Sequence, residues 1–285
     1  MKTRDLLQFT AETFHQVLAQ QMEREERGNL SDPEDLFQHL TYVTTELRRT
    51  YLSRRIHAET GGVVQYGLLE GFFIGDLATW CSQDDAGKLL GFYEEEVCDL
   101  LANLCQTRDI FVDLGGADGF YAVGTVATGH FRESHCYELV DASRANIGRI
   151  AERAGVADRV HLYGAATDQF PLELVQNRVQ LNNAVVLIDI EGAEFDVLTD
   201  ACLCALRDAH VIVEVHDFLV ADGAARLAAL LERASHVFDV TTITTGARNP
   251  GEFPMLHTWS DTDRWLLCSE TRGRKMNWLH LQPTA

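Results

Sequence analysis

The chain has 285 residues, of which 46% are hydrophobic and 24% are charged. This is the composition of an ordinary folded protein, and the length suits one large α/β domain or a core domain with an added subdomain. The formal net charge of −19 argues against a general nucleic-acid binder, because phosphate contacts need clustered Lys and Arg. A basic strip at Arg48, Arg49, Arg54 and Arg55 has helical spacing, which favours a solvated helix face.

The sequence favours a cytoplasmic protein without a membrane anchor. The first residues alternate between polar and apolar types, unlike the unbroken apolar stretch of a secretory signal. The longest aliphatic run is far below the roughly 20 residues that a membrane span needs. The seven cysteines are odd in number and lie mostly in apolar segments, a pattern typical of reduced, buried thiols.

Residues 1–58 are predicted to form a helical hairpin. Apolar residues recur at helical spacing over 3–27, and a break at 29–33 precedes a second helix that ends near Ile56. The apolar stripe of this second helix comprises Leu36, Leu40, Val43, Leu47 and Tyr51. We expect the hairpin to pack against the rest of the chain. A homodimer interface and a substrate cap are the alternatives.

Residues 59–107 are predicted to be a connector that covers the substrate. Glycine and aromatic residues dominate 61–80, which indicates loops and turns. A helix should follow from about Tyr93 to Cys105, because acidic residues in its first turn complement the helix dipole. The loop over 245–262 is also rich in glycine and aromatic residues, and we expect it to help to cover the substrate.

From residue 108 to 285, strand and helix patterns alternate. The predicted strands are 110–114, 134–139, 159–163, 184–190, 210–215, 237–243 and 264–269. The predicted helices between them are 119–129, 143–154, 170–182, 193–206 and 221–234. Five strand–helix units imply an α/β fold with a parallel sheet covered on both faces. The last two strands lack an intervening helix, so we expect an antiparallel pairing at the sheet edge.

The first of these strands runs into a glycine turn. Asp113 ends the apolar run, Gly115 and Gly116 turn the chain, and Gly119 opens the next helix. Such glycines let the backbone approach a ligand and expose N–H groups at a helix N-terminus. The spacing fits neither the dinucleotide fingerprint nor the nucleotide P-loop, which weakens the hypothesis of a NAD-dependent dehydrogenase. A tight turn without a ligand is the alternative.

Two further strand ends could complete a nucleoside site. Glu138 ends the second strand, where a carboxylate can accept hydrogen bonds from both ribose hydroxyls. Small residues after the third strand, Ala166 among them, would leave room for an adenine ring, and Asp168 could accept a bond from its amino group. The alternatives are an exposed strand-end charge or a helix cap at Glu138, and a plain loop with Asp168 as a helix cap.

The fourth strand ends in the most specific segment, Asp189-Ile190-Glu191-Gly192-Ala193-Glu194, and Glu214-Val215-His216 follows the fifth strand. Together with the turn after Asp113 and the pair Tyr137-Glu138, these segments resemble the FkbM-type methyltransferase family. The resemblance covers about residues 108–220. Upstream, the segment from Lys88 to Glu94 is similar to one that precedes the fold in some members. Ala117 is a departure, because many members carry Asn there.

This resemblance implies a Rossmann-like class I methyltransferase sheet of seven strands with the last one antiparallel. It also implies S-adenosyl-L-methionine as the methyl donor and S-adenosyl-L-homocysteine as the product. The residues that it places at the cofactor are Asp113, Gly115, Gly116, Gly119, Glu138, Ala166, Asp168 and Asp189. The expected acceptor is a hydroxyl of a small natural product or sugar. The alternatives are N-methylation, for example of a peptide side chain, and a methyltransferase-like binding partner without turnover.

Methyl transfer is an in-line displacement, so we expect catalysis mainly from positioning of the two reactants. An alcohol must also lose its proton. Histidine, with an ordinary pKa near ~6.5, is the side chain best suited to accept it. His216 is therefore the first candidate for the catalytic base, and Asp189 is the second, as a base or as an orienter of the hydroxyl. Glu191, Glu214 and Tyr93 are expected to face the substrate.

Two other roles are open for these acids. Asp189, Glu214 and His216 could together bind a divalent ion such as Mn²⁺ or Fe²⁺, although a required metal is not favoured. Glu194 is expected to complement the N-terminus of the helix that follows it. Neither role identifies the methyl acceptor.

Overall fold

The computed structural model describes residues 33–75, 84–270 and 274–284, and it excludes the side chains of residues 33–40, 42 and 43. The predicted helix over 3–27 therefore lies outside the described residues. The same holds for three side chains of the predicted stripe, Leu36, Leu40 and Val43.

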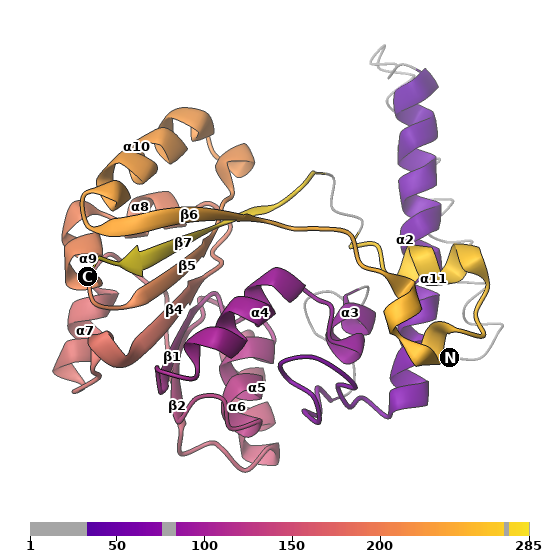
Figure 1. Cartoon of the computed structure of the whole chain (residues 1–285), viewed down its shortest axis with the longest axis horizontal. Helices are drawn as coiled ribbons and strands as arrows, with labels where there is room; N and C mark the ends of the chain where they lie inside the picture. Colours follow the sequence, from indigo (N-terminus) through magenta and orange to yellow (C-terminus); the bar gives the residue numbers. More distant parts are fainter. Residues whose placement is uncertain (1–32, 76–83, 271–273, 285) are drawn as a thin grey trace.

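A seven-stranded sheet forms the centre of the molecule (Figure 1). Its strands are β1 (Ile110–Leu114), β2 (Glu133–Tyr137), β3 (Val160–Tyr163), β4 (Ala184–Ile188), β5 (His210–Glu214), β6 (Phe238–Thr244) and β7 (Asn277–Pro283). Their order is β3-β2-β1-β4-β5-β7-β6. The first five strands pair in parallel, and β7 runs antiparallel to both of its neighbours, β5 and β6. The predicted fold class is confirmed, including the antiparallel last strand.

The two central strands, β1 and β4, are buried over their whole length. Alternate residues point to opposite faces of a sheet, and each face has its own core. Val112 and Val186 belong to one apolar cluster, whereas Phe111 and Val185 belong to the other. Because both faces are covered, these strands are apolar throughout rather than alternating.

The helices divide between the two faces. Side chains of α7 (Phe170–Gln176), α8 (Glu194–Val197), α9 (Asp200–Ala205) and α10 (Gly223–Ser235) join the first cluster. Those of α4 (Glu95–Leu104), α5 (Phe120–Ala127) and α6 (Asp141–Arg153) join the second. The single helix predicted over 193–206 is in fact α8 and α9. Thr199 separates them in an extended conformation, and its side chain accepts the N–H of Cys202 as a helix cap.

The predicted strand over 264–269 is wrong. Most of it belongs to α11 (Asp261–Leu267), and the last strand is β7. A short apolar run fits a strand and a buried helix equally well. The capping signals decide for the helix: the side chain of Ser260 accepts the N–H of Asp263, and Asp261 and Asp263 lie in the first turn.

A third apolar cluster lies beside the sheet, around the long helix α2 (Pro33–Thr60) (Figure 1). The buried members of this cluster are Leu52, Ile56, Ala86, Leu89, Leu90, Phe92, Phe253, Leu256, Trp259, Leu267 and Cys268. They come from α2, from α3 (Asp85–Leu90) and its exit, and from η3 (Pro250–Glu252) through α11. Helix α3 was not predicted, whereas α4 begins and ends close to the predicted positions.

The basic strip on α2 is not a simple solvated face. Arg48 pairs with Asp263 at 2.8 Å, and the guanidinium of Arg55 lies 4.0 Å from the ring centre of Trp259. Arg49 is buried. The strip therefore attaches α2 to the C-terminal part of the third cluster. Over the ranges that the structure describes, no helix has both the length and the apolarity needed to cross a membrane.

Candidate active site

The candidate site lies at the carboxyl ends of the parallel strands. From β1 the chain proceeds to β2 and β3 on one side, and β4 then pairs on the other side of β1. Ligands of open α/β sheets bind where the strand order reverses in this way. Asp189 follows β4 directly, next to the turn that leaves β1. The topology thus brings the two most specific sequence motifs together.

The turn after β1 is pressed against the end of β4. Gly115 has φ +95°, and a Cβ atom at this position would lie 1.8 Å from the carbonyl oxygen of Asp189. A Cβ at Gly116 would lie 2.2 Å from Sγ of Cys136. Only glycine fits at either position. Ala117 has φ +46°, a left-handed conformation that Asn tolerates better than Ala.

A cavity of about 300 Å³ opens beside this turn. Its lining residues include Gly115, Ala117, Glu138, Leu139, Val140, Ala165, Ala166, Asp189, Ile190 and Glu191. Most predicted cofactor residues thus line the cavity or the turn that bounds it. Asp168 is not among the lining residues, and Asp113 is buried beneath the turn.

Glu138 is fixed at the rim of the cavity by two backbone N–H groups. Oε2 accepts the N–H of Ala117 at 2.9 Å, and Oε1 accepts the N–H of Val140 at 2.7 Å. A carboxylate has about four acceptor positions, so two remain for a ligand. The interpretation of Glu138 as an exposed strand-end charge is wrong, because its side chain is buried.

Leu139 and Val140 are lining residues that the sequence analysis did not single out. They follow Glu138 directly and are 73% and 47% exposed. Two large apolar side chains that are exposed at the rim of a cavity can pack against the flat face of a ligand ring. The available signal was an apolar pair just after a strand-ending acid, where a loop is usually polar.

The second half of the site surrounds His216. Its Nε2 lies 3.7 Å from Oδ1 of Asp189 and 3.6 Å from both Oε2 of Glu191 and Oε2 of Glu214. Burial opposes protonation, but Glu194, Asp189 and Glu191 outweigh it and raise the pKa of His216 above its ordinary value. Burial, together with Glu94, raises the pKa of Asp189. The two predicted catalytic residues are therefore adjacent and electrostatically coupled.

Glu194 lies in the first turn of its helix, as expected, and its carboxylate also has a second role. Its buried carboxylate accepts the backbone N–H of Gly192 at 2.7 Å and that of His216 at 2.8 Å. Burial alone would raise the pKa of Glu194, but these bonds and the imidazole hold it below the ordinary value. Glu194 thereby ties the turn after β4 to the end of β5 and fixes the backbone that carries His216.

Glu94 is a further acid that the sequence analysis missed. It is buried, has φ +46°, and accepts a hydrogen bond from the hydroxyl of Tyr121 at 2.9 Å. Its charge contributes to the raised pKa of Asp189, which places it near the reacting end of the site. Its neighbour Tyr93, predicted to face the substrate, packs edge-on against Phe120.

Lys88 attaches this segment to the glycine turn. Its Nζ donates to Oδ2 of Asp118 at 2.6 Å, and both side chains are almost fully buried. The ammonium also lies 5.2 Å from the ring centre of Tyr93 and 5.3 Å from that of Phe120. The upstream segment and the β1–α5 turn are thus one packed unit.

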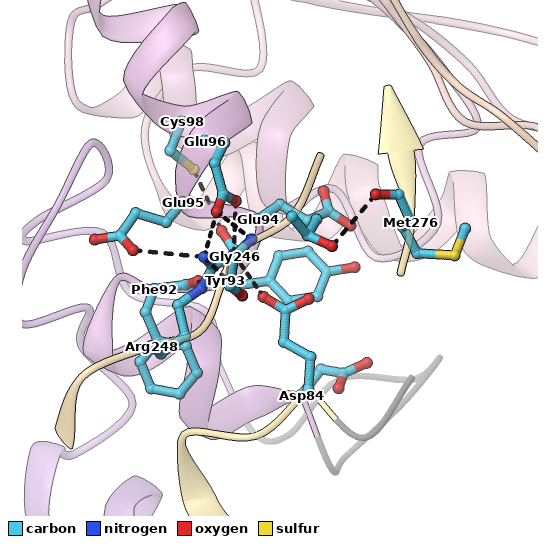
Figure 2. A network of polar contacts seen from close by, with 12 residues as sticks. Asp84, Phe92, Tyr93, Glu94, Glu95, Glu96, Cys98, Gly246, Arg248 and Met276 are labelled. Carbon is cyan, nitrogen blue, oxygen red and sulfur yellow. Dashed lines mark hydrogen bonds and ion pairs between the residues drawn. The ribbon is translucent and has the colours of Figure 1, made fainter. Parts of the chain in front are cut away.

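Arg248 holds the same segment from the other side, as Figure 2 shows. Its Nε donates to the carbonyl oxygen of Phe92 at 2.9 Å, and its two terminal nitrogens donate to the carboxylate of Glu96 at 2.6 and 2.8 Å. A second carboxylate, that of Glu270, accepts at 2.8 Å. This buried clamp fixes the turn in which Glu94 adopts its left-handed conformation.

Asp189, Glu214 and His216 could also hold a divalent ion, since each offers one ligand atom and these atoms lie within 4.8 Å of one another. Carboxylates with one imidazole suit Mn²⁺ or Fe²⁺. The same atoms are equally suited to proton transfer, because Nε2 of His216 faces carboxylates that stabilise the protonated imidazole.

The known proteins that are similar to this chain come from the solved structures. No family model and no curated protein matches the sequence. The O-methyltransferase TomG from Streptomyces achromogenes, in complex with SAM, has 18% identity and a TM-score of 0.44 over 83% of this chain and 90% of that one. An O-methyltransferase from Bacillus cereus in complex with SAH has 12% identity and a TM-score of 0.43 over 65% and 80%.

A precorrin-6y C5,15-methyltransferase from Geobacter metallireducens has 12% identity and a TM-score of 0.42 over 67% of this chain and 89% of that one. Similarity at this level supports no statement about the substrate or the reaction of this chain. The strand order and the antiparallel β7 by themselves give the fold class, the Rossmann-like sheet of class I methyltransferases.

Replacement of Asp113 should change how stability depends on pH. Burial, with the charges of Asp189 and Glu138, raises the pKa of Asp113 to about 8, whereas the unfolded value is about 3.9. Between these values the folded protein holds a proton that the unfolded chain has released, so stability falls as pH rises. We expect the free energy of unfolding to decrease between about pH 5 and pH 8 in the wild type and markedly less in Asp113→Asn.

Urea denaturation at both pH values measures this difference, and the variant Asp158→Asn, at an exposed position, is the control. An equal decrease in all three proteins would contradict the assignment.

Loss of the Arg248 clamp should destabilise the protein. Arg248→Ala leaves the carboxylates of Glu96 and Glu270 without their buried cation, a change that typically costs about 3–5 kcal/mol. Arg248→Lys keeps the charge but not the two-pronged geometry, and it should lie between the alanine variant and the wild type. Urea midpoints measure both, and a cost below about 1 kcal/mol for the alanine variant would mean that the clamp is not a structural anchor.

Proposed function

We propose that the chain is an S-adenosyl-L-methionine-dependent methyltransferase of the FkbM type that methylates a hydroxyl of a small molecule. One observation carries the proposal. A nucleoside-sized cavity with a glycine turn and a fixed acid, Glu138, opens directly onto the cluster of Asp189, Glu191 and His216. The proposed donor site and the proposed base thus lie next to each other, where the strand order reverses.

The cavity supplies a suitable position for each part of the donor. The exposed side chains of Leu139 and Val140, together with the small residues Ala165 and Ala166 that also line the cavity, suit an adenine ring. Glu138, already oriented by two N–H groups, suits the ribose hydroxyls. When bound, the donor would supply an electrophilic methyl group on a sulfonium cation.

The acids explain why a cation would be preferred. Asp113, Glu138 and Asp189 are close enough for their charges to raise the pKa of Asp113, and Glu94 acts likewise on Asp189. A cationic ligand among these four acid groups would favour the ionised forms of Asp113 and Asp189, because an opposite charge offsets both burial and repulsion.

His216 is the group that would remove the acceptor proton. Its Nε2 faces Asp189, Glu191 and Glu214, and these carboxylates stabilise the imidazolium that forms. Glu194, bonded to the backbone N–H of His216, keeps the ring in place. An alcohol needs such a base more than an amine does, which favours a hydroxyl over a nitrogen acceptor. A small natural product or sugar remains the expected acceptor, and a cytoplasmic location the expected setting.

Binding of the donor can be tested by calorimetry with S-adenosyl-L-methionine and S-adenosyl-L-homocysteine. We expect both to bind the wild type, and Leu139→Ala to weaken binding by about 10-fold because one apolar face of the cavity is lost. The matched control is Leu172→Ala, a half-exposed leucine on α7 that does not line the cavity, and it should bind as the wild type does. No binding at high micromolar donor, or equal weakening by both variants, would overturn the proposal.

The role of His216 can be tested with labelled donor and a panel of alcohol and sugar acceptors. His216→Ala should lower kcat by about 10²–10⁴-fold, the usual contribution of a general base, with little change in donor affinity. Because the neutral imidazole is the base and the pKa of His216 is raised, the wild-type rate should increase with pH through a midpoint above 6.5.

Full activity of His216→Ala would eliminate this residue as the base. Donor binding without any methylated product across the panel would favour a non-catalytic binding partner instead. Methylation of amine or amide acceptors alone would favour the nitrogen alternative.

A further inference from the structure

A second group of ligand-type side chains lies on the outer strands of the sheet, away from the candidate active site. Glu133 is the first residue of β2, and His135 follows on the same face of that strand. His161 on the edge strand β3 is the direct partner of His135. The active-site residues lie beyond the carboxyl ends of the strands, whereas this group begins at the amino end of β2.

The three side chains converge. Each offers one ligand atom, and these atoms lie within 4.8 Å of one another. The rings of His135 and His161 stack with their centres 4.7 Å apart, and the electrostatic neighbours of His135 are His161 and Glu133. His135 is 4% exposed, whereas the other two reach solvent.

The two ring nitrogens of His135 differ in their contacts. Its Nδ1 lies 3.0 Å from the hydroxyl of Tyr163, but its Nε2 is buried and has no hydrogen-bond partner among the described residues. A buried polar atom left unpaired costs about 1–3 kcal/mol, and such atoms are rare in folded proteins. A ligand at Nε2 would remove this cost.

The contact between Nδ1 and the hydroxyl of Tyr163 is compatible with the tautomer that binds metals. If Nδ1–H donates to the hydroxyl oxygen of Tyr163, the lone pair of the neutral ring resides on Nε2. Metal-binding histidines commonly have one ring N–H held by a partner in this way. Tyr163 is itself fixed by stacking on Tyr137, with ring centres 4.6 Å apart.

We propose that Glu133, His135 and His161 bind a Zn²⁺ ion, with water in the fourth position. Two imidazoles and one carboxylate are a common zinc ligand set, and imidazole ligands disfavour Mg²⁺ and Ca²⁺. Ligand atoms about 2.1 Å from a tetrahedral zinc are about 3.4 Å apart, so the three side chains must draw closer. Glu133 and His161 can rotate because they reach solvent. Glu133 also pairs with the exposed Arg132 through Oε1, and a carboxylate can serve both partners.

The ion would pin the edge strand of the sheet to its neighbour. Strand β3 has one buried residue out of four, so few apolar contacts hold it. The loop that follows it supplies Ala165 and Ala166 to the cavity. A metal bridge between β2 and β3 would therefore steady one wall of the cofactor site from a distance, without contact with the reacting groups.

The test is zinc binding to the full-length protein after treatment with a chelator, measured by calorimetry and by metal analysis. We expect His161→Ala to bind one zinc fewer than the wild type, or at least about 100-fold more weakly, since even outer partners of metal ligands contribute 10–100-fold. Tyr163→Phe should retain the site with about 10-fold weaker binding. Zn²⁺ should raise the Tm of the wild type and not that of His161→Ala.

The sheet offers a matched control. His210 on β5 and His280 on β7 also stack, with ring centres 5.3 Å apart. In this pair, Nδ1 of His210 and Nε2 of His280 lie 3.0 Å apart and already form a hydrogen bond. His280→Ala should therefore leave zinc binding unchanged. Zinc binding that is intact in His161→Ala would overturn the proposal. Zinc binding that disappears in His216→Ala instead would place the ion in the active site and overturn it as well.

Discussion

The close contact between Gly115 and the carbonyl oxygen of Asp189 is the constraint on which the site depends. Any side chain at Gly115 would collide with the end of β4, so the glycine lets the β1 turn and the β4 acids occupy one space. Glu138 then bonds the N–H of Ala117 in the same turn, and Glu194 bonds the N–H of His216. The cavity and His216 are consequently positioned by buried carboxylates that bond to backbone N–H groups.

Much of this arrangement could be predicted, because the fold places strand ends together. Asp113, Glu138, Asp189 and His216 each lie at or just beyond the end of a strand, and the parallel order of the strands brings these ends together. The failures have local causes. The run 264–269 was too short to distinguish a strand from a helix, and its cap decided for the helix. Glu94 was missed because its importance depends on a left-handed backbone and on long-range burial.

The acid groups at the strand ends differ from those around Arg248. Burial and neighbouring carboxylates raise the pKa values of Asp113 and Asp189, so both hold a proton more tightly than an exposed carboxyl does. By contrast, the acids around Arg248 are satisfied. The chain thus has carboxylates paired with Arg248 in one place and acid groups with raised pKa values at the strand ends in another.

The third apolar cluster has a consequence for how such a protein can diversify. None of its buried members, which come from α2, α3 and the 253–268 region, belongs to a strand of the sheet. Changes within this cluster therefore act on the sheet indirectly, through α3 and the segment that follows it. An exchange of this cluster for another sequence would therefore have to retain Lys88, which lies on α3 and joins the cluster to the glycine turn through Asp118.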